Sequence, residues 1–277
     1  MKFAKYSISR LISTINSQKK VNSATALMFH NISKYDQEKF YDLIVNLKAE
    51  FDILTCNEFH MFINGELDNK GQKIFITFDD GFYSNFVIAK EVLNPLNIKS
   101  LFFVLPKFIE EKQENQKSFV IQSIYNGNVP NDIDSSDMIS MSWENLSEIV
   151  DDGHSIGAHT NNHFRLSEIK DDIILRNEII DSGDYIEKKL GIKVQDFAYP
   201  FGSINSINKN AMSIAKERYK FIYSGVRGHN LIGTNCAAIK REVIDIKDSL
   251  IFNFSLINGG LAPLYARQRK KLESLTL

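Results

Sequence analysis

The segment KIFITFDDG, Lys73–Gly81, indicates both the fold and the chemistry of this chain. Its first six residues are mostly β-branched or aromatic, which predicts a strand that ends abruptly at an Asp-Asp-Gly turn. Asp79 and Asp80 therefore lie at the carboxyl end of this strand. Adjacent carboxylates repel each other, and a cation bound to one of them relieves the repulsion and leaves the other free as a base. The alternative at this point is an ordinary Asp-Gly turn with Asp80 as a local cap.

Strand-like and helix-like segments alternate on both sides of this motif. Roughly seven short apolar segments, from Ala24–His30 to Ala237–Val243, alternate with segments such as Asp36–Phe51, whose apolar residues recur at helical spacing. This alternation predicts an α/β fold with a parallel sheet and outer helices, and the strand count is close to that of a closed (β/α) barrel. Active sites of such barrels lie at the carboxyl ends of the strands, where we expect the two aspartates.

We expect a single domain over residues 1–277, with its core at about 24–245. The stretch at about 107–140 is rich in Glu, Gln, Asn, Asp and Ser, which predicts a polar insertion on one face, as a lid or substrate-facing loop. The C-terminal segment at about 248–277 is predicted to be helical, in two pieces broken near Gly259-Gly260 and Pro263.

The segment HTNNH, His159–His163, follows another apolar strand, so we expect it on the same rim as Asp79 and Asp80. Two imidazoles four residues apart on one helical turn can bind one divalent cation. The alternative is a polar surface turn with incidental histidines. Together with one aspartate they form a three-ligand site with open positions, which is typical of a catalytic metal. Zn²⁺ suits these ligands, and Co²⁺, Ni²⁺ or Fe²⁺ are also compatible.

A third segment, FAYPFG (Phe197–Gly202), ends a predicted strand in a turn. A backbone N–H of such a turn can face a developing oxyanion, as an acyl-transfer site requires. An ordinary strand-to-helix turn is the alternative.

The bulk composition restricts the partners and the location. The net charge is −1, so nothing indicates nucleic acid as a partner. Met1–Val21 lacks the apolar core of a signal peptide, and no segment predicts a membrane span, so we expect a cytoplasmic protein. Tyr265–Leu277 places basic residues beside Leu272 and Leu275, which allows weak peripheral contact with an anionic membrane or a solvated terminal helix. The oligomeric state is left open.

Three motifs together, TFDDG (Thr77–Gly81), SWENLSEIVDDGHSIGAHTNNH (Ser142–His163) and FAYPFG, resemble the successive motifs of the polysaccharide deacetylase family, also called the NodB-homology or carbohydrate esterase 4 group. The resemblance covers about Ala24 to Val243. It implies a distorted (β/α)7 barrel and a metal-dependent sugar N-deacetylase that releases acetate and a free amine.

The resemblance also implies a role for each matching residue. Asp79 would be the catalytic base, and Asp80, His159 and His163 would be the metal ligands. The backbone N–H of Phe201 would help the metal to hold the oxyanion.

The sequence departs from the family pattern at two points. Many members carry an arginine at the position of Ala198, and Arg241 resembles a late arginine that some branches keep; a solvated charge is the alternative for Arg241. No late Leu-x-His motif supplies the general acid. His229 and His30 are the candidates for that role, and a loop histidine or a buried structural histidine is the alternative for each.

We therefore expect removal of an N-acetyl group from a sugar, on a cytoplasmic lipid-linked or nucleotide-linked precursor of a surface polysaccharide. Two alternatives stay open, namely a carbohydrate-binding protein that keeps the metal without turnover, and a deacylase for another small acyl group such as formyl.

Overall fold

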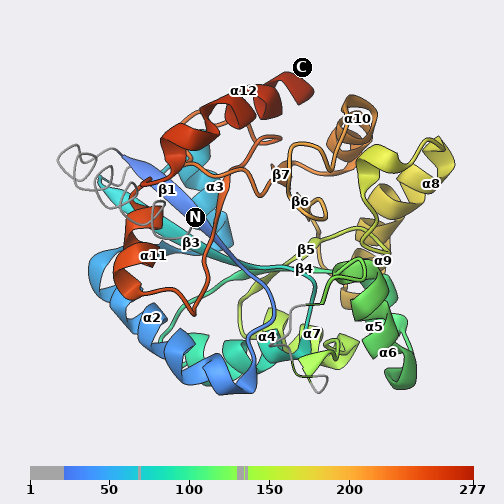
Figure 1. Cartoon of the computed structure of the whole chain (residues 1–277), viewed down its shortest axis with the longest axis horizontal. Helices are drawn as coiled ribbons and strands as arrows, with labels where there is room; N and C mark the ends of the chain where they lie inside the picture. The colour runs from blue at the N-terminus through green and yellow to red at the C-terminus, as the bar shows by residue number, and fades with distance from the viewer. Residues whose placement is uncertain (1–21, 68–69, 130–133, 135–136) are drawn as a thin grey trace.

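The computed structural model describes residues 22–67, 70–129, 134 and 137–277 (Figure 1). The segment Met1–Val21, on which the expectation about a signal peptide rests, lies outside the described residues, as does part of the predicted insertion. In the described part of the chain, no helix is long and apolar enough to span a membrane.

A parallel sheet forms a nearly closed barrel of seven strands, as predicted, in the order β7-β6-β5-β4-β3-β1-β8, and β2 pairs with the first half of β3. A parallel bridge from Tyr223 to Ile239 brings the two ends of this order together. The strands are β1 (Ser23–Phe29), β2 (Asp52–Leu54), β3 (Gln72–Phe78), β4 (Leu101–Val104), β5 (Ser155–Ala158), β6 (Asp196–Ala198), β7 (Phe221–Tyr223) and β8 (Arg241–Val243).

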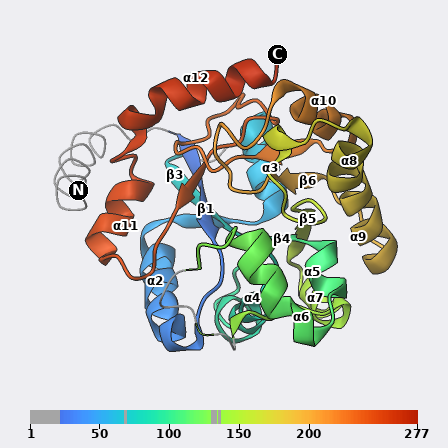
Figure 2. The ribbon, with the colours of Figure 1, turned by 45° about the vertical axis from the view of Figure 1, so that its right-hand side comes forward.

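Helices surround the strands (Figures 1 and 2). The α-helices are α2 (Gln37–Glu50), α3 (Cys56–Asn64), α4 (Tyr83–Ile88), α5 (Pro106–Glu110), α6 (Gln113–Phe119), α7 (Trp143–Asp151), α8 (Asp172–Arg176), α9 (Ser182–Leu190), α10 (Lys209–Arg218), α11 (Leu250–Ile257) and α12 (Ala266–Leu275). The short 3₁₀ and π segments are η1 (Lys34–Asp36), η2 (Ala89–Leu93), η3 (Val120–Ile124), η5 (Leu166–Glu168), η6 (Asn177–Asp181) and η7 (Ala262–Tyr265).

Alternate residues of each strand enter two different hydrophobic clusters, because successive side chains point to opposite faces of a strand. Ile74 and Ile76 pack outward against the surrounding helices. Phe75 belongs to the cluster inside the barrel, together with Phe59 and Phe62 of α3. Helix α3 therefore closes the barrel at the amino-terminal ends of the strands and fills its interior, and the opposite rim is left for the site.

The structure corrects several boundaries. Helix α3 was not among the predicted elements, although Thr55 and Glu58 have the spacing of a capping box at its start. The predicted strand Ala237–Val243 is a short strand, β8, preceded by a turn. The polar insertion contains α5, α6 and η3, whose apolar residues, such as Phe108 and Val120, form a small cluster of their own. The C-terminal segment is helical in two pieces, as predicted.

Helix α12 packs its leucines against the barrel. Leu272 is buried against Val226 and Ala238, and Leu275 packs on the same cluster. Lys271 donates a hydrogen bond to Asn205. These two leucines therefore cover the barrel, and contact of the basic residues of this segment with an anionic membrane stays a prediction.

Candidate active site

Asp79 and Asp80 follow β3 on the rim of the barrel, and each is only 2% exposed. The Asp79 N–H donates to the Phe29 carbonyl at 2.9 Å, which continues the pairing of β3 with β1 by one residue. Asp80 has a φ of 77° and Gly81 a φ of 80°, so the chain reverses sharply here. A non-glycine residue with positive φ is strained. The turn that imposes this φ directs both buried carboxylates toward the same rim.

Asp80, His159 and His163 converge as the sequence predicted. The Asp80 Oδ1 atom lies 3.4 Å from His159 Nε2 and 3.5 Å from His163 Nε2. It has no hydrogen-bond partner among the described residues. With metal–ligand bonds of about 2.0–2.2 Å, two ligand atoms of a tetrahedral cation lie about 3.4 Å apart. The spacing of the three atoms therefore fits a bound divalent cation.

Carbonyl groups fix the orientation of both imidazoles. His159 Nδ1 donates to the Ala198 carbonyl at 2.6 Å, and His163 Nδ1 donates to the Ser123 carbonyl at 2.9 Å. A carbonyl oxygen only accepts, so each Nδ1 carries a hydrogen, and in a neutral ring Nε2 then has the free lone pair. Such second contacts are typical of histidines that bind metals.

The loop that carries the two histidines is not a helical turn, contrary to the sequence prediction. Thr160 has a φ of 69° and His163 a φ of 64°. The His163 N–H donates to Thr160 Oγ1 at 3.0 Å, and buried Glu178 accepts from the Asn162 N–H at 2.9 Å and from Asn162 Nδ2 at 2.6 Å. Sequence reasoning missed Glu178, because it belongs to a different element, η6, and no spacing links it to the loop.

Arg241 reaches Asp79 from β8, two strands away from β3. Its two terminal nitrogens donate to Asp79 Oδ1 and Oδ2 at 2.6 and 2.8 Å. Its Nε donates to the Ser224 carbonyl at 3.0 Å, and its side chain is fully buried. The alternative of a solvated charge is therefore wrong, and the guanidinium holds the Asp79 carboxylate in one orientation.

Burial and the neighbouring charges together shift the pKa values of the site. Burial would raise the pKa of Asp79, but Arg241 and His159 hold it below its ordinary value. Burial would also raise the pKa of Asp80, but His159 and His163 lower it to about 2. Burial lowers the pKa of His163 to about 4. Burial would lower the pKa of His159, but Asp80 and Asp79 raise it. The rim therefore holds two carboxylates at neutral pH, and a cation would compete with a proton for the His159 lone pair.

The structure separates the two candidates for the general acid. His30 follows β1 on the rim, is exposed, and lies close enough to lower the pKa values of both aspartates. His229 instead contacts Ser23, the first residue of β1. A strand of this length spans about 20 Å, so His229 lies at the other end of the barrel and does not belong to the site.

The FAYPFG segment forms the predicted turn. Phe201 has a φ of 63° and Gly202 a φ of 57°, and the Gly202 N–H donates to the Tyr199 carbonyl at 3.2 Å. The Phe201 ring packs against the His163 ring, with centroids 4.7 Å apart, and under the Arg165 guanidinium. The turn therefore lies beside a metal-site histidine.

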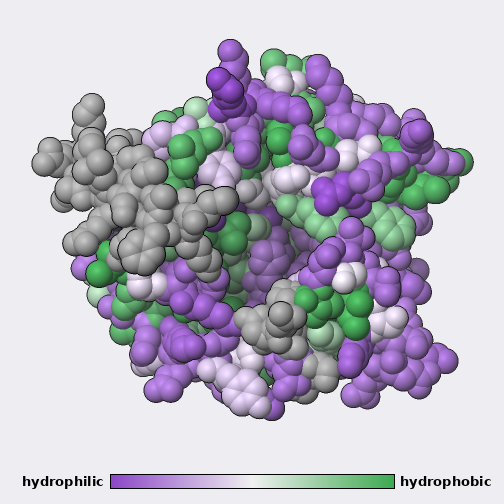
Figure 3. Space-filling model, viewed as in Figure 1, coloured by the Kyte–Doolittle hydropathy of each residue, from purple (hydrophilic) through white to green (hydrophobic). Residues whose placement is uncertain are grey.

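Open space adjoins this rim. A cavity of about 340 Å³ lies beside His30 and is lined by the segments that follow β1 and β8, including Asp36 and Asp245, and by Asp137 of the insertion. The face shown in Figure 3 is hollowed near its centre, with hydrophilic and hydrophobic residues along its walls. A ligand with polar and apolar faces, such as a sugar, suits this lining.

Comparisons with known proteins agree with this geometry. Residues 66–218 match the family model described as polysaccharide deacetylase. IcaB from Ammonifex degensii is similar in structure, with a TM-score of 0.69 and 20% identity over 86% of this chain and 98% of IcaB. The deacetylase PplD from Streptococcus pyogenes, solved in complex with acetate, has a TM-score of 0.65 and 20% identity over 85% of this chain and 98% of PplD.

A third similar structure is a de-N-acetylase from Aggregatibacter actinomycetemcomitans, with a TM-score of 0.64 and 16% identity over 87% of this chain and all of that one (100%). No curated protein matches the sequence significantly. At these identities the solved structures show the fold alone.

Proposed function

The chain belongs to the polysaccharide deacetylase family, and from this premise we propose a metal-dependent N-deacetylase that acts on a sugar precursor in surface-polysaccharide synthesis. As a member of this family it is a carbohydrate deacetylase, a hydrolase of N-acetyl amide bonds. The metal, the substrate, the cytoplasmic location and the roles of individual residues belong to the proposal.

One observation carries the proposal. Asp80 Oδ1, which has no hydrogen-bond partner in the described part of the chain, faces two imidazole nitrogens at 3.4 and 3.5 Å, next to the Asp79–Arg241 ion pair. A carboxylate with two imidazoles leaves coordination positions open, as in catalytic rather than structural sites. A divalent cation held there, Zn²⁺ by preference, would polarise an acetyl carbonyl and make a water molecule more acidic.

The residues of the chain perform the remaining steps. Asp79 is ionised at neutral pH and accepts a proton from the attacking water. Arg241 keeps both carboxylate oxygens of Asp79 in place. The Phe201 N–H donates to the acetyl carbonyl oxygen as negative charge develops on it. The leaving amine needs a proton, and His30, which stands on the same rim, donates it.

Acetate release from N-acetylated glycans, offered free, nucleotide-linked and lipid-linked, tests the proposal. Asp79→Asn should retain the metal and lose deacetylation, whereas His159→Ala should lose both. An Asp79→Asn variant that turns over substrate at the wild-type rate would contradict the assigned mechanism. N-formyl analogues in the same panel show whether the site prefers a smaller acyl group. Binding of glycans by the metal-loaded protein without acetate release would indicate a carbohydrate-binding protein instead.

A further inference from the structure

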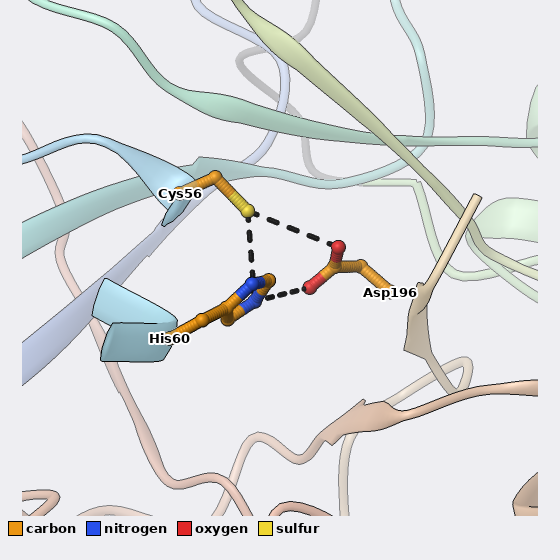
Figure 4. Close-up of side chains that lie close together, drawn as sticks. All are labelled: Cys56, His60 and Asp196. Atoms are coloured by element: carbon orange, nitrogen blue, oxygen red, sulfur yellow. Dashed lines mark hydrogen bonds and ion pairs between the residues drawn. The ribbon is translucent and has the colours of Figure 1, made fainter. Parts of the chain in front are cut away.

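A second group of metal-ligating side chains lies at the amino-terminal end of the barrel, away from the rim that holds Asp80. Cys56 and His60 are four residues apart on α3, and Asp196 is the first residue of β6. Their side chains point toward one another (Figure 4). Cys56 Sγ lies 3.6 Å from His60 Nε2 and 3.8 Å from Asp196 Oδ2, and His60 Nε2 lies 2.8 Å from Asp196 Oδ1.

The local structure fixes the two ligands on α3. Thr55 caps the helix with its side chain, so Cys56 begins the first turn in a defined position. The His60 ring stacks on the ring of Phe221, with centroids 3.4 Å apart and an angle of 5° between the planes. The imidazole therefore cannot turn away from the cluster without losing this contact.

Asp196 is the centre of the cluster. The carboxylate accepts hydrogen bonds from His60, from the Tyr223 hydroxyl at 2.8 Å and from the Cys56 thiol. Burial raises the pKa of the Cys56 thiol, and the nearby Asp196 raises it further. A buried thiol without a cation is a poor nucleophile, so these residues do not form a cysteine–histidine catalytic pair.

We propose that Cys56, His60 and Asp196 bind a divalent cation of the zinc type. Thiolate, imidazole and carboxylate are ligands that Zn²⁺ prefers, and the two anionic ligands neutralise its charge. Around a tetrahedral zinc ion, sulfur lies about 3.6 Å from a nitrogen or oxygen ligand, close to the two sulfur distances in the cluster. The His60–Asp196 contact opens by about 0.6 Å, because two nitrogen and oxygen ligands lie about 3.4 Å apart.

The protons balance in this binding step. The cation replaces the thiol hydrogen of Cys56, which leaves to solvent as one proton per ion. In the metal-free protein His60 Nε2 donates its hydrogen to Asp196, so the ring hydrogen has to move to Nδ1 before Nε2 can bind the ion. The Tyr223 hydroxyl, 3.0 Å from His60 Nε2, or a water molecule takes the fourth position. The ion would link α3 to β6 and so stabilise the position of α3 at the amino-terminal ends of the strands.

Titration of the metal-free full-length protein with Co²⁺ tests this site separately from the rim site. A thiolate ligand gives cobalt a sulfur-to-metal charge-transfer absorption in the near ultraviolet, and the rim ligands contain no sulfur. We expect two ions per wild-type chain and one charge-transfer band. His163→Ala should bind one ion and keep the band, whereas Cys56→Ser should bind one ion and lose it.

Two further variants keep the test decisive. Cys236→Ser replaces the other cysteine, which lies outside the cluster, and should keep two ions and the band. Asp196→Asn keeps the size of the side chain and should weaken binding at the sulfur site at least 10-fold, even if Cys56→Ser does not fold. A wild-type chain without the band, or a band that survives Cys56→Ser, overturns the proposal. Neither result bears on deacetylation, which depends on the rim site.

Discussion

Replacing Arg241 by methionine should destabilise the protein far more than a single surface substitution, because it leaves the Asp79 carboxylate buried without its counter-charge. The two side chains are at most 3% exposed and share hydrogen bonds of 2.6 and 2.8 Å. Removing one partner of a buried ion pair costs about 3–5 kcal/mol of unfolding free energy. At about 2–3 °C per kcal/mol for a chain of this size, Tm should fall by about 6–15 °C.

A double-mutant cycle with Asp79→Asn isolates the pair from the packing of the arginine stem. Each single variant leaves one buried charge, whereas the double variant leaves none, so the double variant should be more stable than the sum of the two losses predicts. We expect a coupling free energy of at least about 2 kcal/mol, measured by urea unfolding in the presence of a chelator. The double variant should still lack deacetylase activity, because it has no base.

Arg176 and Glu217 supply a matched control, since they form the same bidentate geometry at 2.8 and 3.1 Å on the surface, where both are about half exposed. The corresponding cycle, with Arg176→Met and Glu217→Gln, should give a coupling below about 1 kcal/mol. If the Arg241–Asp79 cycle is additive within about 0.5 kcal/mol, or equals the surface cycle, burial does not set the strength of the pair and the reasoning is refuted.

Three further predictions concern pH, metal affinity and backbone shape. Burial lowers the pKa of His154 from 6.5 to about 4, so as the pH falls the unfolded chain takes up a proton before the folded one does. The free energy of unfolding should therefore fall by about 3 kcal/mol between about pH 6.5 and 4. In urea unfolding at several pH values, His154→Asn should reduce this dependence on pH. Glu178→Ala frees Asn162 and should weaken metal binding at the rim about 10–100-fold in a competition assay with a chelating dye, and equal affinity would contradict this role. Gly202 and Gly191 have similar positive φ values, but a Cβ at Gly202 would lie 2.6 Å from backbone, whereas one at Gly191 would meet open space. Gly202→Ala should therefore lower the free energy of unfolding by about 1–3 kcal/mol more than Gly191→Ala does. Equal Tm values for the two variants would exclude the clash.

The barrel and the rim could be predicted because the information is local. A strand that runs into Asp79-Asp80-Gly81 identifies its own carboxyl end, and His159 follows another strand in the same way. In parallel strands these ends meet on one rim, so the topology alone brings the residues together. The backbone of the His159–His163 loop was not predictable from spacing, because contacts with Glu178 and Thr160 decide its positive φ values.

Helix α3 was missed for a different reason. The segment Cys56–Asn64 is short, and its apolar residues fill the barrel interior instead of lying on a sheet face. The alternation of strands and helices in the sequence is the same whether or not a helix fills the interior of the barrel. The cluster of Cys56, His60 and Asp196 depends on the position of α3 inside the barrel, because His60 and Asp196 are 136 residues apart in the sequence.

Arg241, and not a residue of the FAYPFG motif, supplies the charge beside Asp79. Ala198 is fully buried in the interior cluster, and its carbonyl holds His159, so the third motif contributes backbone and no charge. The guanidinium arrives instead from β8, which pairs with β1 beside β3. A second arginine at position 198 would place another buried cation near a pair that is already neutral, at a desolvation cost that nothing offsets. One arginine next to Asp79 therefore suffices, and in this chain it comes from β8.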